Sequence, residues 1–245
     1  MDAALLAALN AERRARRAVI RVTDIETGAE RLVREAELDP ADPLFAELET
    51  RFRTAKSGMA EGPDNVRRFL TVHVPPPRLV VIGAVHISQA LAPMARLAGF
   101  DVTVIDPRTA FATESRFEGV SLLAEWPEEV IPSRVALDAY TGLVAVTHDP
   151  KIDDWPIAEA LRAGAFYVGA LGSRKTHAKR VGRLGALGIA EDSIARIAAP
   201  IGLDIGAQSP AEIAVAVLAQ AIEALRRRPA HLAPRRTAAP ADVTP

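Results

Sequence analysis

The sequence contains no cysteine among its 245 residues, which excludes disulfides, thiolate metal ligands and a cysteine nucleophile for this chain. Aromatic residues make up only 4%, which argues against a stacking surface for single-stranded nucleic acid. The formal net charge is −1, so the basic excess of many nucleic-acid binders is also missing. The apolar runs all fall short of the roughly 18 residues of a membrane span. We expect a cytoplasmic protein that binds neither nucleic acid nor membrane.

Residues 1–74 have the pattern of a small α+β unit. Apolar residues at helical spacing indicate helices, and alternating β-branched segments indicate strands. The predicted elements are a helix over 2–17, strands over 18–23, 31–33 and 69–74, and a helix over 43–56 with Gly58 as its C-cap.

Three consecutive prolines, 75–77, cannot continue a strand or a helix and mark the clearest domain boundary. Beyond them, uninterrupted apolar runs alternate with amphipathic helical segments. This pattern is typical of a parallel sheet covered on both faces. We predict an α/β, Rossmann-like domain over 78–228, followed by a disordered tail over 229–245 that is rich in Pro, Ala and Arg. The apolar runs are 79–82, 102–105, 143–146 and 166–168, and the helical segments are 88–98, 155–162, 174–187, 191–197 and 210–228.

Ligands of such sheets bind at the carboxyl ends of the strands, where this chain places its polar clusters. Gly83 ends the first run, and Asp106 follows the second run at about the spacing of a dinucleotide fingerprint. Val85 and Ser88 stand where that fingerprint has its second and third glycines, which favours the fold but weakens the case for NAD. His86 is either a ligand-facing group or a helix-start histidine bonded to the backbone.

Asp106 is followed two residues later by Arg108. A carboxylate at a strand end can accept from a ribose diol or from a pterin N–H edge, and an arginine can bind phosphate. The alternative is a local surface ion pair of little energetic value.

Titratable residues also follow the third run. Asp153 or Asp154 is expected to be only the N-cap of the next helix. That explanation does not cover His148 and Asp149, which directly follow the strand, so we assign these two to ligand binding.

The most informative cluster follows the fourth run. Ser173 is a good N-cap, and Arg174 and Lys175 then place two cations in the first turn of a helix, where the helix dipole disfavours them. Together with Gly172 in the preceding turn, they predict an anion site, most simply for phosphate. The alternative is that both cations point into solvent at a small cost.

A last cluster precedes the final helix. Ser209, Pro210 and Glu212 form a capping box with proline at the first helical position, so Glu212 is not assigned to catalysis. Asp204 lies between two glycines without such an explanation, and it is a candidate ligand contact.

In order, these segments resemble the XdhC/CoxI family of accessory proteins for molybdenum hydroxylases, over about residues 66–225. The resemblance implies a Rossmann-like domain that binds molybdenum cofactor (molybdopterin) and has no turnover of its own. Such a protein holds the cofactor during sulfuration and delivers it to apo xanthine dehydrogenase or a related hydroxylase, and it is expected to be a homodimer. The matching stretches are Val-Ile-Gly-Ala-Val-His-Ile (81–87), Thr-Val-Ile-Asp-Pro-Arg (103–108), Thr-His-Asp-Pro-Lys (147–151), Gly-Ala-Leu-Gly-Ser-Arg-Lys-Thr-His (169–177) and Pro-Ile-Gly-Leu-Asp-Ile-Gly (200–206).

The resemblance also suggests roles for the candidate residues. The single phosphate of molybdopterin suits the segment 173–175, and pterin N–H groups suit Asp106, Asp149 or Asp204. The molybdenum end would lie near His86 or His148.

The N-terminal portion departs from the family, because its Gly-Gly-Cys element has no counterpart in a chain without cysteine. The sulfur would therefore come from a partner cysteine desulfurase. Two other functions remain open. One is an NAD(P)-dependent oxidoreductase on the same fold, and the other is a scaffold with a vestigial site.

Overall fold

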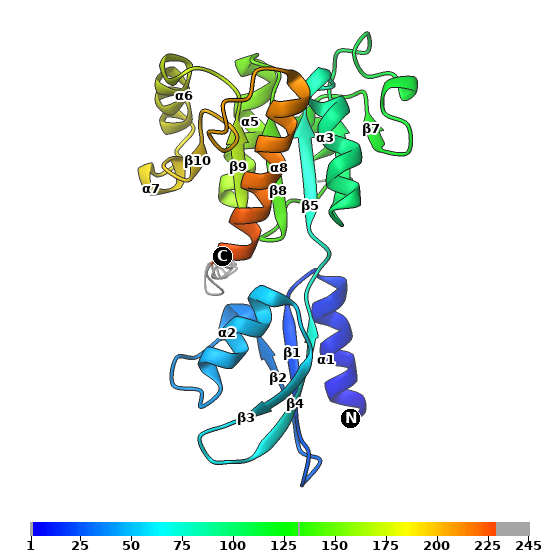
Figure 1. The fold of residues 1–245 in the computed structure, drawn as a ribbon, viewed down its shortest axis with the longest axis vertical. Coiled ribbons are helices and arrows are strands. Elements are labelled where there is room, and N and C mark those ends of the chain that lie inside the picture. The colour runs from blue at the N-terminus through cyan, green and yellow to red at the C-terminus, as the bar shows by residue number, and fades with distance from the viewer. Residues whose placement is uncertain (1, 132, 229–245) are drawn as a thin grey trace, which may run out of the picture. The chain divides into compact units, whose positions relative to one another are not determined.

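The computed structural model describes residues 2–131 and 133–228. Their contacts divide the described chain into two units, residues 2–74 and 75–228 (Figure 1). The tail predicted over 229–245 lies outside the described residues. Within them, no helix combines the length and the apolar composition that crossing a bilayer requires.

The first unit is a four-stranded antiparallel sheet with the strand order β2-β1-β4-β3. Helix α2 contacts β1, and the buried Ile20, Leu48, Phe52 and Leu70 belong to the apolar interior of this unit. The elements are α1 (Ala3–Arg14), β1 (Val19–Asp24), β2 (Glu30–Arg34), the 3-10 turn η1 (Glu35–Glu37), α2 (Phe45–Thr54), β3 (Gly58–Glu61) and β4 (Arg67–His73).

The prediction of Gly58 as the C-cap of α2 is wrong. The helix ends at Thr54, and Ala55 takes the left-handed cap conformation with φ 58°. Gly58 instead begins β3, a strand of four residues that pairs with β4. So short an edge strand has too few residues for its alternation to be recognised.

The second unit contains a six-stranded sheet in which every strand pair is parallel, with the order β10-β9-β8-β5-β6-β7. This confirms the Rossmann-like α/β prediction. The strands are β5 (Arg78–Ile82), β6 (Asp101–Ile105), β7 (Ser121–Leu123), β8 (Thr141–Ala145), β9 (Tyr167–Ala170) and β10 (Ile197–Ala198). The helices are α3 (His86–Leu97), α4 (Pro127–Val130), α5 (Pro150–Arg162), α6 (Arg174–Ala186), α7 (Glu191–Ile194) and α8 (Pro210–Arg227), with a 3-10 turn η2 (Glu114–Arg116).

Two separate apolar cores lie on the two faces of this sheet. One contains Val80 and Leu143 with residues of α4, α5 and α6, and the other contains Val81 and Val144 with residues of α3 and α8. Alternate residues of each central strand thus enter opposite cores, which explains the uninterrupted apolar runs.

The helix predicted over 191–197 is too long. Helix α7 ends at Ile194, and residues 197–198 form β10, which pairs with β9 at the sheet edge. A strand of two residues gives no periodicity of its own, so the sequence could not separate it from the preceding helix.

Candidate functional site

The turn from β5 to α3 requires its glycine. Gly83 has φ +117°, and a Cβ atom on it would lie 2.8 Å from Cγ2 of Thr147, just beyond β8. The turn therefore packs tightly against the neighbouring strand end. Helix α3 begins at His86 without a side-chain cap, so its N-terminal partial charge is open to an anion. His86 is exposed and forms no hydrogen bond with another described residue.

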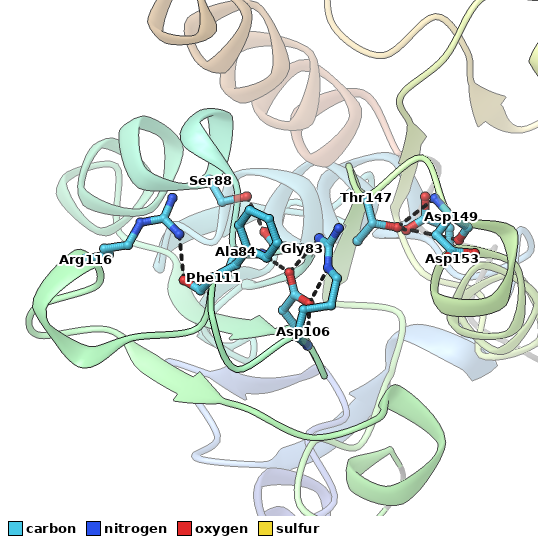
Figure 2. A network of polar contacts seen from close by, with 10 residues as sticks. Gly83, Ala84, Ser88, Asp106, Phe111, Arg116, Thr147, Asp149 and Asp153 are labelled. Carbon is cyan, nitrogen blue, oxygen red and sulfur yellow. Dashed lines mark hydrogen bonds and ion pairs between the residues drawn. The ribbon is translucent and has the colours of Figure 1, made fainter.

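Asp106 follows β6 and is fully buried. Its carboxylate accepts from the N–H of Ala84 (2.7 Å) and of Arg108 (2.9 Å), and from Nε (2.9 Å) and Nη2 (2.8 Å) of Arg108 (Figure 2). Burial alone would raise the pKa of Asp106, but these donors outweigh it and hold the pKa below its usual value. Ala84 and Arg108 already donate four hydrogen bonds to this carboxylate. We therefore interpret Asp106 as the residue that orients Arg108 and the Gly83-Ala84 turn. Direct contact with a pterin or ribose, as expected from the sequence, would have to displace these bonds.

Replacing Asp106 with asparagine is expected to lower the free energy of unfolding by about 2–4 kcal/mol, because one amide oxygen cannot replace a carboxylate shared by Arg108 and Ala84. The loss should shrink as the pH falls through the lowered pKa of the wild-type carboxyl, because the wild type then loses the same interaction. Urea denaturation at pH 7 measures the effect. Asp101→Asn, at the exposed start of the same strand, is the control, with an expected change under about 0.5 kcal/mol. Equal effects of the two variants would contradict the prediction.

The turn from β8 to α5 is organised by Thr147. Its hydroxyl donates to Oδ1 of Asp153 (2.7 Å) and accepts from the N–H of Asp149 (3.1 Å), as Figure 2 shows. His148 lies between them with a left-handed backbone, φ +66°, and its side chain is exposed. Such a conformation is uncommon outside glycine, and the surrounding hydrogen bonds maintain it.

The expected N-cap of α5 is wrong. The helix begins at Pro150 rather than Trp155, and Asp149 is its N-cap, accepting from the N–H of Lys151 (2.9 Å). Proline tolerates the first helical position, so the helix starts as early as the strand end allows. Asp149 therefore has a structural role that the sequence interpretation denied it. Its other carboxylate oxygen forms no hydrogen bond within the described part of the chain.

Asp153 and Asp154 instead lie inside α5 and are buried. Burial raises the pKa of Asp153 to about 6, although Thr147 and Arg180 counteract the shift. Its Oδ2 has no hydrogen-bond partner among the described residues. Asp154 pairs with both Arg183 and Arg180 of α6.

Arg180 was not identified from the sequence. Its side chain is 2% exposed, and Nη2 donates to the carbonyl of Leu171 (3.2 Å) just beyond β9. Arg180 thereby connects α6 to the turn that precedes it. A basic residue in a helix of basic residues carries no local signal of burial, so only the packing reveals it.

The N-cap predicted for the helix after β9 is confirmed. Gly172 has φ +138°, and the Ser173 hydroxyl accepts from the N–H of Thr176 (3.3 Å) as the N-cap. Arg174 and Lys175 are exposed, the first turn contains no acidic residue, and neither cation pairs with another described residue. Two uncompensated cations thus lie at the positive end of a helix dipole.

The segment before α8 also agrees. Ser209 and Glu212 form the predicted capping box, in which Glu212 accepts from the N–H groups of Gln208 and Ser209. The pKa of Glu212 is lowered by these donors. Asp204 is exposed and forms no hydrogen bond with a described residue.

The polar turns follow parallel strands, so they all lie at the carboxyl ends of the strands, where ligands of this fold bind. This end of the sheet offers an uncapped helix start at α3 and free cations at α6, which together suit an anionic ligand. Among the described residues, no group of His, Asp and Glu side chains is arranged to hold a metal ion. The fold is that of a Rossmann-type domain, and the chemistry of these turns suits a small anionic molecule.

Residues 79–221 match the family model described as the XdhC Rossmann domain, and the chain belongs to this family. It is 32% identical to the uncharacterized protein YqeB of Escherichia coli, 34% to a probable xanthine dehydrogenase subunit of Bacillus subtilis and 29% to the molybdenum cofactor insertion chaperone PaoD of Escherichia coli. These alignments cover 67%, 62% and 64% of this chain but 30%, 44% and 42% of the relatives. The chain thus spans less than half the length of these relatives.

A crystal structure described as a xanthine dehydrogenase from Bacillus halodurans has the same fold, with a TM-score of 0.60 and 23% identity. The similarity covers 90% of this chain and 66% of that one.

Proposed function

We propose that this protein binds molybdenum cofactor, holds it during sulfuration and delivers it to an apoenzyme of the xanthine dehydrogenase type, without turnover of its own. Membership in the XdhC family supports this proposal. The name of one relative, a molybdenum cofactor insertion chaperone, supports it further.

The observation that carries the proposal is the pair of free cations at the start of α6. Arg174 and Lys175 lie at the positive end of the α6 dipole, which repels them and lowers stability. A bound phosphate would attract both the cations and the helix start, so the net electrostatic interaction would become favourable. Molybdopterin carries one terminal phosphate, so this turn fits that end of the cofactor. The uncapped start of α3 is a second position that suits negative charge.

The pterin end requires hydrogen-bond acceptors. Asp204 and the free oxygen of Asp149 fit this need, whereas the carboxylate of Asp106 is filled by Arg108 and Ala84. The cofactor, when bound, supplies the molybdenum centre, and this chain has no thiolate to ligate it or to carry sulfur. We therefore propose a cysteine desulfurase as the sulfur-supplying partner, and the apo hydroxylase as the acceptor.

The test is anaerobic binding of molybdenum cofactor to the purified protein, with NAD(P)H titrated in parallel. Stoichiometric cofactor uptake without a response to NAD(P)H is expected. Tight NAD(P)H binding without cofactor uptake would instead favour the oxidoreductase, although Val85 at the N-cap of α3 and the engaged Asp106 count against it. Absence of any tight small ligand would favour the scaffold.

A further inference from the structure

The connection from β6 to β7 carries an exposed aromatic side chain close to the candidate site. Phe111 is 43% exposed, although the chain has few aromatic residues and buries most of its large apolar ones. The guanidinium of Arg108 lies over its ring, with Cζ 4.7 Å from the ring centroid. This is within the range of a cation–π contact.

Several contacts hold Phe111 in place. Its N–H donates to the carbonyl of Arg108 (2.9 Å), and its carbonyl accepts from Nη1 of Arg116 (2.7 Å). Arg116 also donates to Gln89 of α3 (2.9 Å), which connects this loop to the helix of the β5–α3 turn. Figure 2 shows Phe111 in the same network of polar contacts as Asp106, Gly83 and Ala84. These bonds fix the backbone of Phe111, and the guanidinium of Arg108 lies over its ring, so the side chain is positioned before any ligand arrives.

Arg108 places this ring beside the strand ends. The carboxylate of Asp106, the residue directly after β6, accepts from Nε and Nη2 of Arg108. The guanidinium therefore lies at the carboxyl end of β6. Because Asp106 accepts from both Nε and Nη2 along one edge of the guanidinium, the plane that Arg108 presents to Phe111 is fixed.

We propose that Phe111, backed by Arg108, is a stacking platform for a planar heteroaromatic ring of the bound ligand. The inference rests on the proposed function in one respect, since molybdenum cofactor would offer its pterin to this platform. A nucleobase has the same stacking chemistry. In either case Phe111 contributes the exposed π-face and Arg108 fixes its orientation, while the phosphate is bound at the start of α6.

The experiment separates the ring from the phosphate. Equilibrium binding of neopterin, which is a pterin without phosphate, of AMP and of inorganic phosphate is measured for the full chain and for Phe111→Ala, Phe111→Trp and Phe69→Ala. Phe111→Ala is expected to weaken binding of the ring-containing probe by about tenfold or more, the size of one lost aromatic stack. The affinity of Phe111→Ala for inorganic phosphate should stay within about twofold of that of the wild type. Phe111→Trp should restore ring binding, and Phe69→Ala, a 37% exposed phenylalanine of the first unit, should change neither affinity.

Unchanged neopterin and AMP binding in Phe111→Ala would overturn the platform, as would failure of Phe111→Trp to restore binding while its melting temperature equals that of the wild type. The platform would also be overturned if the wild type bound neither neopterin nor AMP. Binding of AMP but not neopterin, lost in Phe111→Ala, would support the platform and contradict the proposed molybdenum cofactor function.

Discussion

Replacing Arg174 and Lys175 together with alanine is expected to weaken the binding of molybdenum cofactor by about 100-fold or more. Each cation can make a charge-assisted hydrogen bond to phosphate worth about 1.5 kcal/mol or more, and tenfold in affinity corresponds to about 1.4 kcal/mol. Neither cation has a partner among the described residues, so their removal breaks no ion pair there. The variant should fold at least as stably as the wild type, because it removes two cations from the positive end of a helix.

Anaerobic equilibrium binding of the cofactor measures this effect. The matched control is Arg53→Ala with Lys56→Ala, which removes one arginine and one lysine at two exposed positions of the first unit. If both double variants lose the same affinity, the effect is one of overall charge. If the 174/175 variant keeps the wild-type affinity, the phosphate site does not lie at the start of α6.

Asp153→Asn is expected to gain stability relative to the wild type as the pH rises. The pKa of Asp153 is raised by burial from 3.8 to about 6, so the folded protein binds this proton more tightly than the unfolded chain does. The free energy of unfolding of the wild type therefore falls between about pH 4 and pH 6, by about 3 kcal/mol at 1.36 kcal/mol per pH unit. Asparagine keeps an oxygen that can accept from Thr147 and has no proton to lose.

Urea denaturation of both proteins at pH 3.5 and pH 8 measures this change as a difference of differences, in which the other titrating groups cancel. Glu212→Gln is a control of opposite sign. The pKa of Glu212 is lowered by the N–H groups of Gln208 and Ser209, so this substitution should become more costly as the pH rises. A stability difference between Asp153→Asn and the wild type that does not vary with pH would show that Asp153 ionises as an ordinary carboxyl does.

Local capping chemistry explains which site predictions agree with the structure. Ser173 and the Ser209–Glu212 box depend on residues three positions apart, and a helix start needs no distant partner to satisfy them. The N-cap of α5 is Asp149, whereas the sequence predicts Asp153 or Asp154. The difference arises because the start of α5 depends on where the buried strand β8 ends.

The polar contacts behind the site could not be predicted in the same way. The sequence offers Asp106 either as an acceptor for a ligand or as the partner of Arg108 in a surface ion pair. Only the fold shows that the paired carboxylate is buried and that Ala84, 22 residues away, also donates to it. Likewise, the neighbouring residues in the sequence indicate neither the burial of Arg180 nor the exposure of Phe111. One is a buried cation in a basic helix, and the other is an apolar residue kept at the surface by Arg108 and Arg116.

The sequence by itself determined the parallel α/β architecture and the alternation of its central strands and helices along the chain, and it predicts that ligands bind at the carboxyl ends of these strands. These follow from local apolar periodicity, because strands buried on both faces must be apolar at nearly every position. It also determined the cation pair at the start of α6, which depends on neighbouring residues alone. Only the tertiary structure decided which carboxylates remain free for a ligand. That outcome depends on donors from separate turns, which meet only when the strands have aligned.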